Sequence, residues 1–480
     1  MSKFNKKVKS EVKNLAGGDA YNQSDELALV SLLLTSFVND QFYRTAGESL
    51  KSLQDLVNKI GDKEFLAKSA IFARKEFGMR SITHALTGEL SSHISGKEWS
   101  KNFYQKIVNR VDDMSEILAY YLKNKTNTKS PKIPNALKKG FASAFDKFDN
   151  YQLAKWRSES GEVKLIDVVN LVHPQPTDKN REALSQLVAG NLKNTATWES
   201  MLSSAGQKAS DEEELKDLKA DAWDELISTG RLGYFALLRN LRNIILQSPK
   251  SVTAACQLLE NENLIKKSKV LPFRFTKAWE EISKMESDNE VRKALKSINA
   301  ALEISLVNVP VFEGETLVVV DVSGSMSGKP SEIASLFAAM LVKANECDIM
   351  TFANYAKYMS YDPCDSIMAL RNTFKFSGGG TNINDVFNKA SKKYDRIIIL
   401  SDFQSWIGED KPEKEFARYC QSTGANPHIY SWDLAGLSTT QFPEDKINCL
   451  AGFSDKVFDV IKLLEEDRMA LLTKIKEVKI

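Results

Sequence analysis

Residues 316–325 read TLVVVDVSGS, and this stretch decides the fold of the second half of the chain. Its first five residues form a continuous, largely β-branched run, which is typical of a strand buried on both faces of a parallel sheet. Short apolar runs and helical patterns alternate after it. Such alternation predicts a doubly wound α/β domain, whose functional loops follow the carboxyl ends of the strands. We expect further strands at 349–352, 396–400 and 428–432, and helices between them at 331–345, 384–392 and 412–422.

Side chains that carry oxygen gather where those loops are expected. Asp321, Ser323 and Ser325 form a DxSxS sequence directly after the first strand. Thr381 follows three glycines, where the backbone can approach closely, and Asp402 follows the third expected strand. Hard oxygen donors with few negative charges suit Mg²⁺ or Mn²⁺, which keep several bound waters. The sequence therefore predicts a divalent-metal site formed by these residues, and a vacant or merely structural site is the alternative.

The first half of the chain has a different pattern, which is helical almost throughout residues 25–301. Apolar residues recur there at three- and four-residue intervals, as in Leu27–Phe37. Many mid-length helices without strands predict an all-α, HEAT-like helical-repeat array with degenerate repeats. Residues 1–20 are polar and are expected to form a flexible arm, and Ser203–Lys219 an exposed loop or a polar helix. Further helices are expected at 48–60, 63–77, 98–110, 112–123 and 133–146.

The composition is that of a folded protein with more than one domain. The chain has 480 residues, of which 42% are hydrophobic and 27% charged. Its net charge is +2, but residues 315–480 hold 19 basic and 23 acidic residues, so the front part is mildly basic and favours a polyanion. Five cysteines without CxxC pairs argue against a disulfide framework and a zinc site. Without a signal peptide or a membrane span in the sequence, we expect a soluble, cytoplasmic monomer.

Two known families share these patterns. The predicted metal site resembles the metal-ion-dependent adhesion site of von Willebrand A domains, whose pattern is DxSxS, then a Thr, then an Asp. The helical half resembles the TROVE module of Ro proteins over roughly residues 20–305. The stretches that carry this second resemblance are Ala16–Gly18 leading into Tyr21 and Ser24–Asp25, then Phe72–Lys75, Met79–Arg80, Pro134–Pro174 and Gly233–Ile244.

The two resemblances together imply a domain organisation like that of the Ro autoantigen family. Residues 1–20 would be the N-terminal arm, and residues 21–310 a TROVE helical-repeat module that closes into a ring. Residues 311–480 would be an α/β von Willebrand A domain, which is Rossmann-like in its sheet.

Within the helical half, positive charge lies beside aromatic rings. Cations neutralise phosphates, and an exposed ring can stack on an unpaired base. The basic candidates are Lys138, Lys139, Lys155 and Arg157, and the aromatic ones are Phe141, Phe145, Phe148, Tyr151 and Trp156.

Other candidates lie outside this cluster. His173 can donate a hydrogen bond to a phosphate or a base edge, and Arg239 and Arg242 lie three residues apart on one helix face. The alternatives are a core position for most of the Phe residues, a structural role for His173 and surface salt bridges for the arginines.

The resemblance to Ro proteins implies more specific roles. Lys155, Arg157 and His173 match positions of an outer surface that binds small noncoding Y RNAs, with Lys138 and Lys139 as neighbours. The Arg239 and Arg242 pair would face a central hole that takes the single-stranded 3′ ends of misfolded RNAs. In von Willebrand A domains a partner's carboxylate often completes the metal's coordination, which implies a protein partner.

Two functions stay open from the sequence. The first is a non-catalytic RNA-binding protein, which acts in noncoding-RNA quality control or as a scaffold that tethers RNA to a ribonuclease. The second is a metal-dependent protein-interaction adaptor. The sequence shows no nucleophile–base pair, no paired carboxylates in one loop and no cofactor fingerprint, so we do not expect an enzyme.

Overall fold

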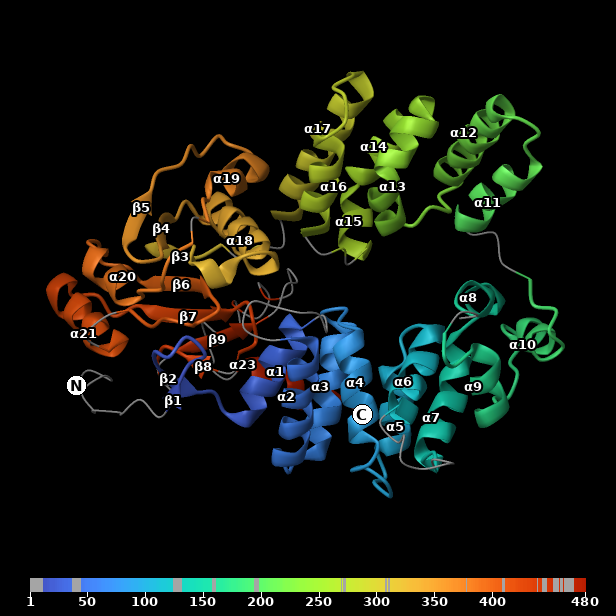
Figure 1. Cartoon of the computed structure of the whole chain (residues 1–480), viewed down its shortest axis with the longest axis horizontal. Helices are drawn as coiled ribbons and strands as arrows, with labels where there is room; N and C mark the ends of the chain where they lie inside the picture. Colours follow the sequence, from blue (N-terminus) through green and yellow to red (C-terminus); the bar gives the residue numbers. More distant parts are fainter. Residues whose placement is uncertain are drawn as a thin grey trace. The chain divides into compact units, whose positions relative to one another are not determined.

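The computed structural model divides into two compact units (Figure 1). The first unit comprises Met1–Thr35, Gln41–Arg44 and Lys208–Leu471, and the second comprises Ser36–Asp40, Thr45–Gln207 and Leu472–Ile480. The residues that the structure describes are 12–36, 45–123, 132–157, 161–193, 198–268, 270, 273–306, 309, 311–376, 378–407, 411–437, 439–442, 447–451, 457, 461 and 470–480.

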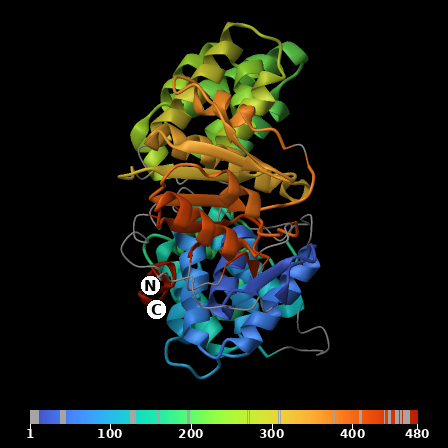
Figure 2. The same ribbon diagram turned by 90° about the vertical axis from the view of Figure 1, so that its left-hand side faces the viewer.

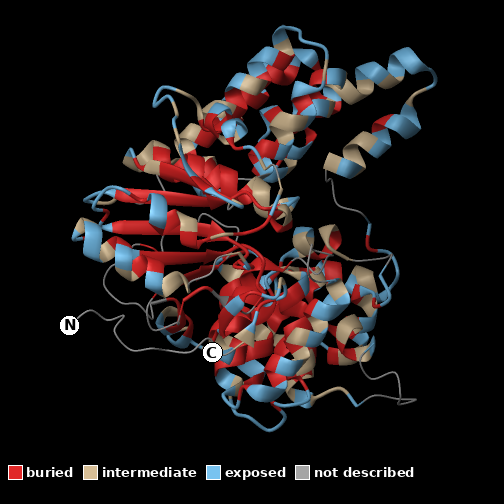
Figure 3. Cartoon of the chain, turned by 60° about the vertical axis from the view of Figure 1, so that its left-hand side comes forward, coloured by how far each residue is buried: buried red, intermediate tan, exposed pale blue. Residues whose placement is uncertain are grey.

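A six-stranded sheet forms the centre of the first unit, and Figure 2 shows its strands from the side. The strand order is β5-β4-β3-β6-β7-β9, as labelled in Figure 1. All neighbours pair in parallel except the antiparallel β4–β5 pair. The β-branched run was expected to be buried, and every residue of β3 is buried, as Figure 3 shows for most of the sheet. The strands are β3 (Thr316–Asp321), β4 (Asp348–Phe352), β5 (Ala356–Met359), β6 (Arg396–Ser401), β7 (His428–Asp433) and β9 (Asn448–Ala451).

The order of these strands determines where a site can form. After β3 the chain forms β4 and β5 on one side, and the later strands β6, β7 and β9 are added on the other side of β3. The β3–β6 boundary is therefore a topological switch point, where loops diverge and leave a crevice. The helices between the strands confirm the predicted alternation. They are α18 (Lys329–Asn345), α19 (Ile367–Thr373), α20 (Asn384–Lys389) and α21 (Pro412–Thr423).

The N-terminal residues belong to this unit and differ from the flexible arm expected for residues 1–20. Strands β1 (Val12–Lys13) and β2 (Asp19–Asn22) form a hairpin, and β2 pairs with β8 (Thr439–Thr440). Helix α1 (Asp25–Thr35) follows and packs on β9. Residues 1–11 of the predicted arm lie outside the described residues.

Six helices of the TROVE-like region also belong to the first unit. Helices α13, α14, α16 and α17 pack against one another, and α16 is tied to α18 and α19 by ion pairs. The compact unit therefore extends across residue 310, where the sequence placed a domain boundary. The helices are α12 (Glu212–Ser228), α13 (Tyr234–Gln247), α14 (Val252–Leu259), α15 (Glu262–Ser268), α16 (Phe273–Ser283) and α17 (Asn289–Ser305).

The second unit is an array of helices that pack mainly as pairs, such as α4 with α6 and α5 with α7. The five helices expected between residues 48 and 146 are present, with bounds shifted by a few residues. The helices are α2 (Ala46–Lys59), α3 (Lys63–Lys75), α4 (Ser81–Leu90), α5 (Ser100–Ile107), α6 (Val111–Lys123), α7 (Asn135–Ala144), α8 (Asn150–Lys155), α9 (Leu165–Val172), α10 (Arg181–Val188) and α11 (Trp198–Lys208), with a 3₁₀ turn at Phe145–Lys147.

Local signals explain several of the helix ends. Thr45 and Glu48 form a capping box at the start of α2, and Asp62 caps α3. The charged stretch Ser203–Lys219 is helical on both sides of Asp211, which caps α12, so the polar-helix alternative is confirmed there. None of the helices in the described part of the chain is long and apolar enough to cross a membrane.

Candidate functional site

The five predicted metal ligands lie together at the carboxyl edge of the sheet. Asp321 ends β3 and Asp402 follows β6, so the two carboxylates flank the switch point, and both are buried. The backbone N–H of Ser323 donates to Asp321 Oδ1 (2.9 Å), and the Ser323 and Ser325 hydroxyls lie 3.2 Å apart. The loop that carries Thr381 reaches the same place, because the carbonyl of Thr381 accepts a 2.8 Å hydrogen bond from Ser405 Oγ.

The two carboxylates oppose each other electrostatically. Burial, and after it the charge of Asp321, raise the pKa of Asp402 to about 7, although hydrogen bonds from Ser325 and the Gln404 backbone act in the opposite direction. Burial also raises the pKa of Asp321, although Ser323 and Ser401 donate hydrogen bonds to it. A cation placed between two such groups would offset the cost of burying their charge.

Two residues at this edge escaped the sequence analysis. Ser401 Oγ donates to Asp321 Oδ2 at 2.6 Å, and the charge of Asp433, which ends β7, acts on Asp402. Both are the last residues of their strands, which is the signal that could have identified them. Among the residues that the structure describes, no group of three or more His, Cys, Asp or Glu side chains could hold a metal. The donor set here is rich in hydroxyls instead.

The basic candidates of the second unit come from three helices. Lys138 and Lys139 lie in α7, Lys155 ends α8, and His173 caps α9 with a left-handed backbone (φ 48°). His173 and Lys139 are exposed and Lys155 is half-buried. Arg157 has a structural contact, because its guanidinium donates to the carbonyl of Leu192.

The aromatic candidates separate into core and surface. Phe141, Phe145 and Phe148 are buried, which confirms the core alternative for them. Tyr151 is 44% exposed, and the ammonium of Lys155, one turn later, lies 5.5 Å from its ring centre. Trp156 is stacked against Arg110, whose Cζ is 3.7 Å from the ring centre. Tyr151 is therefore the candidate ring that is available to a base.

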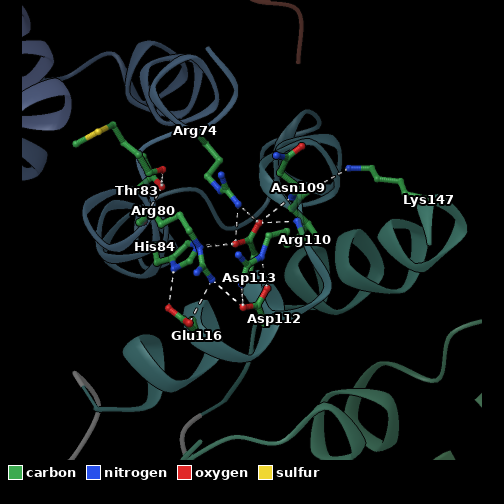
Figure 4. A network of polar contacts seen from close by, with 12 residues as sticks. Arg74, Arg80, Thr83, His84, Asn109, Arg110, Asp112, Asp113, Glu116 and Lys147 are labelled. Atoms are coloured by element: carbon green, nitrogen blue, oxygen red, sulfur yellow. Dashed lines mark hydrogen bonds and ion pairs between the residues drawn. The ribbon is translucent and has the colours of Figure 1, made fainter. Parts of the chain in front are cut away.

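A network of charged side chains, several of them buried, joins α3, α4 and α6 in the same unit (Figure 4). Arg74 donates two hydrogen bonds to Asp113, at 2.9 and 3.0 Å, and both residues are buried. His84 lies between Asp113 (3.0 Å) and Glu116 (3.2 Å). Burial alone would lower the pKa of His84, but these two carboxylates raise it overall. Two arginines of this network, Arg74 and Arg80, lie in the Phe72–Lys75 and Met79–Arg80 stretches that resemble the Ro family.

The remaining two predicted residues line a pocket in the first unit. Arg239 and Arg242 are exposed on α13, and a cavity of about 490 Å³ opens between them and α16. Phe235 and Arg274 also line it, with Arg274 Cζ 5.5 Å from the Phe235 ring centre. Burial and the charge of Arg239 lower the pKa of Arg274. The sequence missed the contribution of α16 because it lies some 35 residues further along the chain. The other lining residues are Leu238, Lys277, Ala278, Glu281 and Ile282.

Known proteins share both the sequence pattern and the fold. The model of the TROVE domain family matches residues 30–217 and 189–330. The RNA-binding protein RO60 of Deinococcus radiodurans is 20% identical over 500 residues, which cover 90% of each protein. Telomerase protein component 1 of Mus musculus is 23% identical over 354 residues, which cover 56% of this chain but only 13% of the mouse protein. The crystal structure of the Deinococcus radiodurans RO (RSR) protein matches 91% of this chain and 98% of its own, with a TM-score of 0.59 and 16% identity.

Proposed function

The chain belongs to the TROVE domain family, and from this premise we propose that it is a non-catalytic RNA-binding protein. A relative that is similar along nearly its whole length is named as RNA-binding, which supports the proposal. The bound RNA would be a small, structured noncoding RNA of the Y type, held on the basic surface of the second unit. The protein would act as a cytoplasmic monomer in RNA quality control, or as a scaffold for a ribonuclease.

One observation carries the proposal: the half-exposed ring of Tyr151 lies beside the ammonium of Lys155, near the end of α8. A ring and a cation one helical turn apart can take the base and the phosphate of one unpaired nucleotide. The exposed His173 and Lys139, on helices of the same unit, add further donors for phosphates.

A salt titration tests this proposal. The probe is a fluorescein-labelled RNA hairpin with an unpaired 3′ tail, and its anisotropy reports binding to the full chain. We expect affinity to fall steeply with salt, because each neutralised phosphate releases counterions. The double variant Lys155→Ala with His173→Ala should weaken binding about tenfold or more, since each lost contact costs roughly 1 kcal/mol. The matched double variant Lys250→Ala with His428→Ala removes an exposed Lys and His elsewhere and should bind normally. Equal losses in both double variants would contradict the assignment.

A second binding place would take single strands. The pocket between α13 and α16 combines four cations (Arg239, Arg242, Arg274 and Lys277) with the half-exposed ring of Phe235. Its floor contains the apolar Leu238 and Ile282, and one acid, Glu281, faces the cations. This chemistry suits a single-stranded 3′ end, with a base on Phe235 and phosphates on the arginines.

Removing the tail from the probe tests the pocket. The double variant Arg239→Ala with Arg242→Ala should bind the tailed hairpin more weakly than the wild type does. The tailless hairpin should bind the wild type and the double variant equally well. A similar loss for both probes would show that the arginines contribute only general charge.

The carboxyl edge of the sheet would hold Mg²⁺ or Mn²⁺, as in a von Willebrand A domain. Asp321 and Asp402 would supply charge and the hydroxyls of Ser323, Ser325 and Thr381 neutral oxygen. The fit is supported by two buried carboxylates that repel each other and have hydroxyls as neighbours. The bound ion would supply an open coordination position for a carboxylate of a protein partner.

A thermal-shift titration with MgCl₂ and MnCl₂ tests the metal proposal. The ion should raise the melting temperature of the wild type, because it binds the folded state only. Asp321→Ala should abolish that shift and leave RNA affinity unchanged. The double variant Lys155→Ala with His173→Ala should weaken RNA binding and leave the metal-induced shift unchanged.

The alternative function, a metal-dependent adaptor, makes a different prediction. Such a protein would lose its partner on treatment with EDTA and would show no affinity for RNA even at low salt.

A further inference from the structure

The end of helix α8 is held by an unusual contact. Trp156 caps this helix of six residues, and two cations lie close to its ring. Arg110 Cζ is 3.7 Å from the ring centre, and Lys155 Nζ is 5.2 Å from it. A helix this short is marginal without tertiary contacts, so its last turn depends on such an anchor.

Asp112 fixes the direction of the Arg110 guanidinium. Arg110 Nε donates to Asp112 Oδ1 at 2.9 Å, and Nη2 donates to Oδ2. Arg80 donates to the same carboxylate (2.9 Å) and also lies 3.5 Å from the buried Asp113 (Figure 4). The guanidinium thus presents its donor edge to Asp112 and its flat face to Trp156, a geometry that lysine cannot copy.

This arrangement has a consequence for Lys155. A free lysine side chain loses rotamer entropy when it is fixed on a phosphate, and a lysine that is already restrained loses less. The ammonium of Lys155 is restrained between the rings of Trp156 (5.2 Å) and Tyr151 (5.5 Å). Asp112 offsets the charge of Arg110, which would otherwise repel the nearby ammonium of Lys155.

We propose that Arg110 is a positioning residue of the RNA surface: by stacking on Trp156 it fixes the end of α8 and holds Lys155 ready for a phosphate. This inference rests on the proposed RNA-binding function. It assigns Arg110 no direct contact with RNA, because its edge is engaged by Asp112 and its face by Trp156.

A double-mutant cycle on the tailed hairpin tests the proposal. Arg110→Gln should weaken binding about fivefold in the wild type and leave it unchanged in the Lys155→Ala background, because coupled neighbours are non-additive. It should also lower the slope of log affinity against log salt by about 0.7–0.9, the value for one lost phosphate contact. Arg231→Gln removes an exposed arginine of the other unit and should change neither quantity.

Two conservative variants separate positioning from charge. Arg110→Lys keeps the charge but loses the stack, so it should bind almost as weakly as Arg110→Gln. Asp112→Asn removes a negative charge, which by electrostatics alone would tighten RNA binding. Because it also releases Arg110 from its position, we expect weaker binding instead.

Three results would overturn the inference, provided that melting temperatures show the variants to be folded. They are full affinity of Arg110→Lys, tighter binding by Asp112→Asn, or an equal loss from Arg110→Gln in the Lys155→Ala background. Any of these leaves the RNA-binding function intact. If the wild type binds no RNA at low salt, the proposed function itself fails, and the inference with it.

Discussion

His84 illustrates how single residues are set by their neighbours. Its two ring nitrogens face Asp113 and Glu116, and each carboxylate can only accept a hydrogen bond. A neutral imidazole has one N–H and would satisfy one partner, so the imidazolium form is favoured and the pKa of His84 is raised. Burial raises the pKa of Asp113, but His84 and Arg74 lower it overall, and the hydrogen bond from His84 lowers the pKa of Glu116.

These shifts predict how stability depends on pH. Stability from His84 is fully present below its unfolded pKa of about 6.5 and is lost as pH rises through the raised folded value. Stability from Asp113 and Glu116 is present above their unfolded values and is lost in acid. His84→Gln should therefore cost about 1.5–3 kcal/mol near pH 6, the usual worth of a hydrogen bond to a charged group, and less at higher pH.

Denaturant unfolding of the wild type and His84→Gln at several pH values measures this difference. The exposed His428→Gln is the control and should change the free energy of unfolding only slightly. A cost of His84→Gln that does not shrink as pH rises would contradict the imidazolium assignment.

The sequence could place residues correctly where they follow the carboxyl ends of parallel strands. Asp321 and Asp402 could be placed together because parallel strands bring their carboxyl ends to one edge. Arg274 and the partners of His84 could not, because packing between helices decides which charged side chains meet, and no local spacing encodes it. The core positions of Phe141 and Phe145 followed from helical periodicity.

At the scale of secondary-structure elements, the N-terminal hairpin was the main surprise. Asn14 Nδ2 donates to the carbonyl of Ser405 (2.7 Å), and Leu15 N–H donates to the side chain of Gln404 (2.7 Å). These contacts fix the hairpin on the loop that carries Asp402. The sequence could not show them, because a two-residue strand has no usable periodicity and the loop that bonds Asn14 and Leu15 lies almost 400 residues further along the chain.

Gly18 makes the closest approach in this contact, so it should not tolerate a side chain. A Cβ atom there would lie 1.9 Å from the Ser405 carbonyl oxygen and 2.7 Å from Trp406 Cα, both backbone atoms. We expect Gly18→Ala to lower the free energy of unfolding by about 1–3 kcal/mol through overpacking.

Gly47→Ala is the matched control for this substitution. A Cβ atom at that position in α2 meets only Thr45 Oγ1, at 3.9 Å, so stability should stay equal or rise. Thermal unfolding of both variants makes the comparison, and an unchanged Gly18→Ala protein would show that the hairpin is not fixed on the loop.

For the whole molecule, the two units are interleaved along the chain. The chain leaves the first unit after residue 35, returns to it for residues 41–44 and again from residue 208, and residues 472–480 belong to the second unit. Segments 36–40 and 45–207 therefore form one unit with residues 472–480, whereas the sequence predicts an arm, a helical module and an α/β domain as consecutive ranges, with boundaries after residues 20 and 310. The sequence pattern shows where helices give way to strands. It does not show which helices before that point pack against the strands and helices after it.

The C-terminal residues should thus matter for stability although they end the chain. Ile475 in α23 (Ala470–Lys476) is 0% exposed, and the carbonyls of Lys476 and Lys479 accept hydrogen bonds from Lys68 (2.8 Å) and Lys106 (3.0 Å). Ile475→Ala should cost about 2–5 kcal/mol, as in other cores.

Val478→Ala, a half-buried neighbour, should cost clearly less. Differential scanning calorimetry compares the two variants. Equal melting temperatures for wild type and Ile475→Ala would mean that the chain end does not belong to the folded unit.

The position of α1 has a consequence for how the protein is made. All residues from Leu27 to Thr35 are buried, and the helix packs on β9, whose residues Asn448–Ala451 leave the ribosome more than 400 residues later. At 5–20 residues per second, translation of that interval takes roughly 20–80 s. The apolar side chains of α1 stay exposed on the nascent chain for this time, so we expect chaperones to bind this segment early. Helix α1 is therefore synthesised long before the strand on which it packs.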